Sequence, residues 1–159
     1  YVDKKTGLPN REKLNIYIGE MAGKVLPEAF TCFTLNLDNL SELTKRFGYT
    51  VGDGVLKDFA GLVQLMGDTE GMRGYNGVGR FVVFFEECSS KKAAAMIRIL
   101  DNQVEEYNSL NPEYPIRYTA AWATTEETDT YEIRELLRLS QKKWKQMEKE
   151  KKDKTEEET

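Results

Sequence analysis

The chain has 159 residues, 40% of them hydrophobic, which is the size and composition of one globular domain. Its net charge of -4 and its pI of about 5.1 argue against a protein that binds nucleic acid through a broad basic surface. The chain has no histidine, which excludes Ser-His-Asp and Cys-His catalysis and histidine-ligated metals. A metal ion would need carboxylate ligands, which points to Mg²⁺ or Ca²⁺.

The first half of the chain alternates helical and strand patterns. Apolar residues at helical spacing predict a helix after Pro9-Asn10, a short helix that ends at Gly48 and a longer helix from about Gly52. Residues 30–37 are mostly apolar and β-branched, which is typical of a buried strand. The predicted inward faces of the three helices are, in order, Leu14, Ile18, Met21 and Val25; Leu40, Leu43 and Phe47; and Val55, Phe59, Leu62, Val63 and Met66.

The second half predicts a hairpin, a helix, a strand and a final helix. The hairpin covers about residues 70–86 and turns at residues 76–79, because Asn-Gly is a strong signal for a tight turn. Residues 116–123 have a strand pattern, and Asp129 with Glu132 resembles a capping pair before the last helix. Strands with helices between them indicate an α+β fold in which the helices pack on one sheet.

Cysteine usage, apolar runs and the ends of the chain add further expectations. Cys32 and Cys88 stand far apart, and we expect two reduced, buried thiols, with a disulfide or a reactive thiol as the alternative. No apolar run approaches the roughly 20 residues that span a bilayer, and the N-terminal residues lack the apolar core of a signal peptide. Because the first residue is not Met, we expect a piece of a longer protein. Residues 149–159 are rich in Lys and Glu, which predicts a solvated helical extension or a disordered linker.

Four segments resemble the signature segments of the GGDEF family, the diguanylate cyclase fold. Residues 6–11, Thr-Gly-Leu-Pro-Asn-Arg preceded by Asp3, resemble D-x-L-T-G-L-P-N-R. Residues 36–40 are similar to D-x-D-x-F, and residues 47–53 to Y-G-H-x-x-G-D. Residues 77–81, Gly-Val-Gly-Arg-Phe, stand where the family has G-G-D-E-F. The match covers nearly the whole chain, in order and at the right spacings.

This resemblance implies one mostly antiparallel sheet of the ferredoxin-like, nucleotide-cyclase palm type, in a GGDEF-like domain over residues 1–148. Family members condense two GTP molecules into cyclic di-GMP across a dimer, and each domain holds one GTP and Mg²⁺. The family's metal ligands are the first carboxylate of D-x-D, the next backbone carbonyl and the third position of G-G-D-E-F. The fourth position, a Glu, assists in metal binding or deprotonation.

The chain departs from the family at the metal positions. Asn36 replaces the first carboxylate, Gly79 the third hairpin position and the cation Arg80 the fourth, so these three are vestigial catalytic positions. Asp38 keeps the second carboxylate and is a candidate cation ligand with the Leu37 carbonyl, although capping of the following helix is an alternative. Charge-assisted contacts contribute roughly 1.5–3 kcal/mol each, so the loss of several predicts that Mg²⁺ no longer binds.

The nucleotide-contacting positions are partly kept. Thr44 replaces the family's guanine-reading Asn, whereas Asp53 keeps the partner carboxylate, with a helix N-terminal carboxylate as the alternative. Arg80 can grip a phosphate at the glycine turn beside Gly77, with a solvated or salt-bridged hairpin residue as the alternative. The family's A-K-x-x-G-R-N phosphate grip is not recognisable near the C-terminus, and residues 68–71 lack its R-x-x-D product-inhibition motif.

We therefore predict a catalytically inactive, GGDEF-like regulatory or interaction domain of a bacterial cyclic di-GMP signalling protein. The alternatives are a GTP-sensing domain without turnover, where Mg²⁺ accompanies GTP only if binding persists, and a residual diguanylate cyclase. The expected partners are other domains of the same longer protein, of PAS or EAL type, with a homodimer and GTP left open and no nucleic acid. The implied location is cytoplasmic, with membrane tethering of the full-length protein left open.

Overall fold

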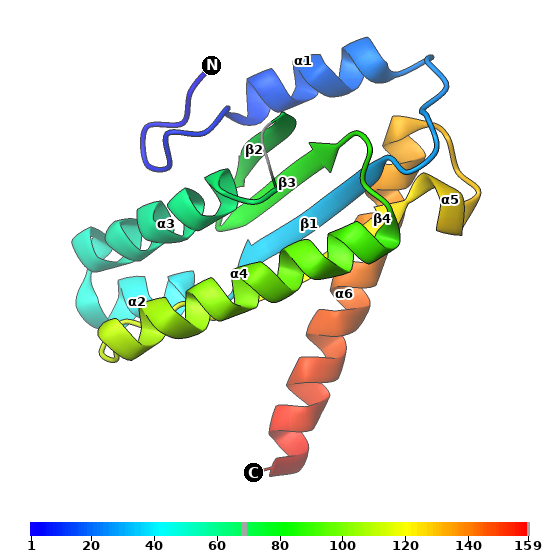
Figure 1. The fold of residues 1–159 in the computed structure, drawn as a ribbon. Helices are drawn as coiled ribbons and strands as arrows, with labels where there is room; N and C mark the ends of the chain where they lie inside the picture. Colours follow the sequence, from blue (N-terminus) through cyan, green and yellow to red (C-terminus); the bar gives the residue numbers. More distant parts are fainter. Residues whose placement is uncertain (68–69, 159) are drawn as a thin grey trace.

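The computed structural model describes residues 1–67 and 70–158, which fold around one sheet (Figure 1). In chain order the elements are α1 (Arg11–Met21), β1 (Thr31–Leu37), α2 (Leu40–Phe47), α3 (Tyr49–Gln64), β2 (Gly71–Gly77), β3 (Arg80–Phe85), α4 (Ser90–Leu110), β4 (Tyr118–Thr124), α5 (Thr125–Thr128) and α6 (Ile133–Glu158). The predicted order of elements is confirmed, and the one-turn helix α5 is an addition. Residues 68 and 69, part of the stretch without R-x-x-D, lie outside the described residues.

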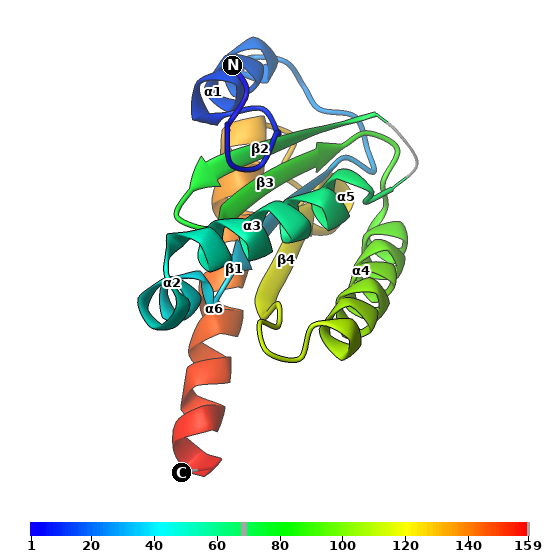
Figure 2. The ribbon, with the colours of Figure 1, turned by 90° about the vertical axis from the view of Figure 1, so that its left-hand side faces the viewer.

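The four strands form one antiparallel sheet in the order β2-β3-β1-β4. Helices α1 and α6 cover one face of this sheet, and α2, α3 and α4 cover the other (Figures 1 and 2). The α+β fold with helices packed on a single antiparallel sheet is therefore confirmed. In this topology the C-terminal end of the central strand β1 lies beside the turn of the β2–β3 hairpin.

The central strand β1 supplies both layers of the core, because alternate side chains of a strand point to opposite faces. Phe33 and Leu35 join the cluster that packs against α2, α3 and α4. Cys32 faces the other way, into the cluster with α1 and α6. Thr34 is also buried on that second face, where its hydroxyl lies 2.7 Å from the hydroxyl of Ser140 in α6. The next residue in this series, Asn36, therefore faces α6 as well.

Three helix ends show how the sequence sets the helix boundaries. The side chain of Asn10 accepts a hydrogen bond from the backbone N–H of Lys13 and caps α1, as expected. Gly48 has φ of 91°, so α2 ends there and α3 begins at the next residue, not near Gly52 as predicted. The predicted Asp129–Glu132 capping pair is wrong, because Glu132 itself accepts the hydrogen bond from the N–H of Glu135.

Some of the predicted inward side chains face solvent. Val25 is 85% exposed, because α1 ends at Met21 and the chain turns away before it. Phe47 is 40% exposed and packs on the ring of Tyr114, with 4.8 Å between the ring centroids. The predicted state of the cysteines is confirmed: both are free and buried.

The last helix extends beyond the predicted end of the domain at residue 148. α6 continues without a break to Glu158, so residues 149–158 form a helical extension. The second half of α6 runs beyond the edge of the sheet (Figures 1 and 2). The domain boundary at residue 148 stays a prediction. Within the described ranges, no helix is both long enough and apolar enough to cross a membrane.

Candidate functional site

Three polar side chains from neighbouring strands lie together under α6. In the β1–β3 ladder Asn36 is opposite Arg80, and in the β1–β4 ladder it is opposite Thr119. Residues that are directly opposite in an antiparallel pair project to the same face. The sheet thus places two of the vestigial catalytic positions beside each other, on the face that α6 covers.

The carboxylate of Asp38 is held by two side chains of this group. The Asn36 amide donates to one carboxylate oxygen at 2.9 Å, and the Thr119 hydroxyl donates to the other at 2.6 Å. Lys151 of α6 extends the chain of contacts, because its ammonium donates to the Thr119 hydroxyl at 2.8 Å and to the Tyr118 carbonyl at 2.9 Å. Asp38 does not cap α2, so the structure differs from that alternative.

A hollow of about 470 Å³ opens beside this chain of hydrogen bonds. Both signs of charge line it, and the lining residues are Asn36, Asp38, Thr119, Glu148, Lys151, Lys152, Thr155 and Glu156. Both lysines of this lining have partners: Lys151 donates to the Thr119 hydroxyl, and Lys152 forms an ion pair with Glu148 at 3.3 Å. The hollow offers lysine ammonium groups to an anion, next to carboxylates that oppose one. The hydroxyls of Thr119 and Thr155 already donate to Asp38 and to the Lys151 carbonyl.

Arg80, at the start of β3, packs on an aromatic ring. Its guanidinium lies over the indole ring of Trp144 in α6, 4.2 Å from the ring centroid. The Arg80 Nε and the Trp144 Nε1 are both buried and have no hydrogen-bond partner among the described residues. The alternative prediction for Arg80 was a solvated or salt-bridged side chain. The described part of the structure shows neither, because the guanidinium is stacked on the indole ring.

The glycine turn of the hairpin has the backbone shape that the sequence predicts. Gly77 and Gly79 have φ of 88° and 84°, a region that other residues rarely adopt. The N–H of Gly79 donates to the hydroxyl of Tyr75 at 2.8 Å, and its carbonyl accepts from the N–H of Leu37 at 2.8 Å. Burial raises the pKa of the Tyr75 hydroxyl above its ordinary value. One of the turn amides that would face a phosphate is thus already bonded within the protein.

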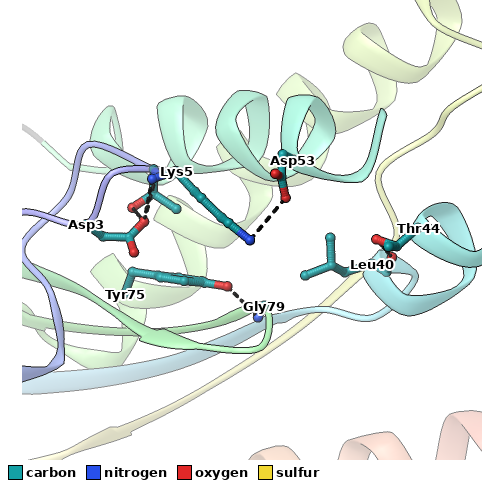
Figure 3. A network of polar contacts seen from close by, with 8 residues as sticks. Asp3, Lys5, Leu40, Thr44, Asp53, Tyr75 and Gly79 are labelled. Carbon is teal, nitrogen blue, oxygen red and sulfur yellow. Dashed lines mark hydrogen bonds and ion pairs between the residues drawn. The ribbon is translucent and has the colours of Figure 1, made fainter. Parts of the chain in front are cut away.

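The candidate guanine-binding residues lie on α2 and α3 (Figure 3). The Thr44 hydroxyl donates to the Leu40 carbonyl of its own helix at 2.9 Å. Asp53 forms an ion pair with Lys5 at 3.4 Å, and both side chains remain about half exposed. Because α3 begins at Tyr49, Asp53 is in the second turn of the helix and not at its N-terminus. Figure 3 shows Lys5 reaching toward Asp53 across the space between the hairpin and α3.

The donor set at the former metal position does not fit Mg²⁺, which prefers several hard oxygen ligands in a near-octahedral arrangement. Asn36 offers only a neutral amide oxygen, since its Nδ2 donates to Asp38, and Gly79 offers no side chain. Both Asp38 oxygens accept hydrogen bonds, and Arg80 adds a positive charge on the same face of the sheet.

Three residues of the site, Lys151, Tyr75 and Lys5, were not predicted from the sequence. Lys151 lies in the predicted tail, but it is seven residues after Trp144, and two helical turns place both residues on one face. That spacing was the available signal. The roles of Tyr75 and Lys5 depend on the approach of the hairpin turn and the N-terminal segment, for which the sequence has no comparable signal.

The comparisons with known proteins agree with this geometry. The family model described as "Diguanylate cyclase, GGDEF domain" matches residues 1–154. No curated protein sequence matches the chain. A solved diguanylate cyclase/phosphodiesterase from Caldicellulosiruptor saccharolyticus has a TM-score of 0.74 and 18% identity over 94% of this chain and 88% of that one. The FimX GGDEF domain from Pseudomonas aeruginosa has a TM-score of 0.72 and 18% identity over 89% of each chain.

A longer protein also contains a similar domain. The Vibrio cholerae LapD S helix-GGDEF-EAL structure has a TM-score of 0.65 and 14% identity, and the match covers 78% of this chain and 29% of that one. The structural similarity to these proteins establishes the fold, and the family model establishes the family. The chain belongs to the diguanylate cyclase GGDEF domain family.

Proposed function

We propose that this domain is a regulatory or interaction module of cyclic di-GMP signalling that does not convert GTP into cyclic di-GMP. The observation that carries the proposal is the new use of the former metal positions. Arg80 is stacked on Trp144, and Asp38 accepts hydrogen bonds from Asn36 and Thr119. These side chains support the packing of α6 on the sheet.

Charge supports the same proposal. Metal-assisted transfer of a nucleotidyl group needs a cation that neutralises the phosphates and activates the attacking hydroxyl. Arg80 can neutralise a phosphate, but a guanidinium stays protonated and cannot coordinate the attacking oxygen. With a glycine at the third hairpin position and an amide at residue 36, only the Asp38 carboxylate is left to offset the repulsion between Arg80 and Mg²⁺, and both of its oxygens already accept hydrogen bonds.

The test is an assay of the purified domain with GTP and either Mg²⁺ or Mn²⁺, with cyclic di-GMP measured by chromatography. We expect no product above the level of a heat-denatured sample. The matched control is Asp38→Ala, which removes the last carboxylate of the old site. Product that accumulates with time in the unmodified domain and disappears in Asp38→Ala would contradict the proposal and identify a residual cyclase.

A second candidate function is nucleotide sensing without turnover, and the hollow beside Lys151 favours it together with Asp53. If Asp53 binds guanine, Lys5 competes for the same carboxylate. Titration calorimetry with GTP should then show tighter binding in Lys5→Met and weaker binding in Asp53→Ala, with and without Mg²⁺. No heat in any of the three proteins would leave only the interaction module.

We also propose that the domain acts in the cytoplasm, within a longer protein that carries other domains of PAS or EAL type. The similarity to a GGDEF domain joined to an EAL domain in Vibrio cholerae LapD supports this setting. Co-expression of the domain with its chain neighbours, followed by measurement of their activity, tests it. An activity of the neighbouring domain that is the same with and without this domain would contradict the proposal.

A further inference from the structure

The outward side of α6 carries a line of positive charge. Six exposed cations share this side, and we call them the cationic ridge: Arg134, Arg138, Lys142, Lys145, Lys149 and Lys152. At about 100° per residue, the six fall within an arc of about 80° around the helix. The buried side of α6, with Leu136, Ser140 and Trp144, lies roughly opposite. The ridge therefore faces away from the sheet.

The ridge is a local reversal of the protein's charge. Residues 134–152 contain eight cations and three carboxylates, although the whole chain has 23 cations and 27 carboxylates. Two ridge members pair with carboxylates that flank the ridge, Glu135 and Glu148. In the described part of the chain, the ridge lysines Lys142, Lys145 and Lys149 form no ion pair. A solvated surface more often mixes the two signs.

The cost of this arrangement also indicates a partner. Successive ridge members are three or four residues apart, and like charges at these spacings repel and destabilise a helix. Five such neighbouring pairs follow one another along α6. Attraction to the carboxylates of a partner would offset this repulsion.

The spacing of the ridge matches a second helix. From Arg138 to Lys152 the steps alternate between four and three residues, which is the 3.5-residue repeat that keeps charged side chains in line along two paired helices. Over 18 residues at 1.5 Å each, the ridge is about 27 Å long. The second half of α6 extends beyond the sheet, so other elements leave it accessible (Figures 1 and 2).

We propose that the cationic ridge is a docking surface for an acidic α-helix of another domain or protein, with carboxylates at heptad spacing. Between Arg134 and Lys152 the arc holds no apolar side chain that would insert into a membrane. The net charge of -4 opposes a broad contact with lipid headgroups or nucleic acid. Of the six ridge residues, only Lys152 at the end also lines the hollow beside Asn36 and Thr119. The other five lie outside that hollow, so the inference goes beyond the proposed function and does not depend on whether GTP binds.

The probe is a synthetic helical peptide of three heptads with its glutamates on one face. The comparison peptide has the same composition with the glutamates spread around the helix. Fluorescence anisotropy at about 50 mM salt should show that the heptad peptide binds at least about tenfold tighter than the comparison peptide. Binding should weaken at about 300 mM salt, because screening reduces contacts between exposed charges.

Two triple variants with the same change of charge separate the ridge from general electrostatics. The ridge variant is Lys142→Gln, Lys145→Gln and Lys149→Gln. The control variant replaces three exposed lysines outside α6, by Lys24→Gln, Lys57→Gln and Lys91→Gln. We expect at least about tenfold weaker peptide binding in the ridge variant and less than about twofold in the control. The Tm of the ridge variant should equal or exceed that of the unmodified domain, because repulsion is removed.

Three outcomes would overturn the proposal. The first is equal binding of the two peptides, and the second is equal weakening in the two triple variants, since either result means that only net charge matters. The third is tighter binding to vesicles with about 30% phosphatidylglycerol, or to duplex DNA, than to the heptad peptide, since the ridge would then serve a different class of partner.

Discussion

The guanidinium of Arg80 lies 4.2 Å from the centroid of the Trp144 ring, and this stack joins the β2–β3 hairpin to α6. Arg80 stands at the fourth position of the hairpin signature, where the family has a glutamate. In this chain the position supports packing between the sheet and a helix. Together with the contact between Lys151 and Thr119, it attaches α6 to the C-terminal end of β1 and its neighbours.

Arg80→Ala should lower the free energy of unfolding by about 1–2 kcal/mol, because a partly buried cation–π stack and the packing of the arginine stem are lost. Arg80→Lys should recover only part of this, since an ammonium lacks the planar face that stacks on indole. Urea unfolding measures both, with Arg98→Ala on the exposed side of α4 as the control. An Arg80→Ala midpoint equal to that of Arg98→Ala would contradict the role of the stack.

Gly52→Ala should destabilise the domain by about 1–3 kcal/mol, because a Cβ at Gly52 would lie 2.3 Å from the Thr44 hydroxyl oxygen. Gly54→Ala is the matched control in the same helix. A Cβ there has nothing within 4 Å, so this change should stabilise the domain by about 0.5–1 kcal/mol. Thermal unfolding should give Tm shifts of opposite sign. Shifts of the same sign would show that α2 and α3 do not pack this closely in solution.

Thr119→Val should cost about 1–3 kcal/mol, because the Asp38 carboxylate and the Lys151 ammonium both lose a partner while the volume is kept. Lys151→Met should cost less than about 0.5 kcal/mol, since that side chain is largely exposed. Both variants should increase amide hydrogen exchange in the last turns of α6. Exchange there that matches the unmodified domain would mean that the contact does not hold the helix.

The stability of the domain should fall at alkaline pH because of Cys32. Burial raises the pKa of this thiol to about 12, although a hydrogen bond with Ser140 lowers it in part. The unfolded thiol ionises near pH 8.5, so Cys32 contributes full stability below that pH and loses it progressively up to about pH 12.

Urea unfolding across pH 8 to about 11 measures this loss, with a slope for Cys32 of at most about 1.4 kcal/mol per pH unit. Cys32→Ala should show a shallower decline than the unmodified domain. Other buried groups contribute equally to both proteins, such as Cys88, whose pKa burial raises without any contribution from Cys32. Parallel pH profiles would show that Cys32 is not protected from ionisation.

Local sequence signals accounted for most elements and failed at specific junctions. Asn10 capped its helix, and the hairpin turn lies within the predicted residues 76–79, because each depends on a few adjacent residues. The tip of the turn is Val78-Gly79, whereas Asn76 and Gly77 belong to β2. The helical spacing of apolar residues predicted that Phe47 and Val25 face the core, but both side chains are exposed to solvent. The positive φ of Gly48 and the early end of α1 set their orientation, and neither is visible in hydrophobic periodicity.

The family, the order of the elements and the loss of carboxylates at residues 36, 79 and 80 follow from residue identity and spacing alone. The contacts that replaced those carboxylates depend on how the chain folds. Trp144 and Lys151 are more than 30 residues from Arg80 and Thr119 in the chain, and α6 brings them together by crossing the sheet. Side-chain contacts of this kind follow from strand register and helix position, which no local pattern encodes.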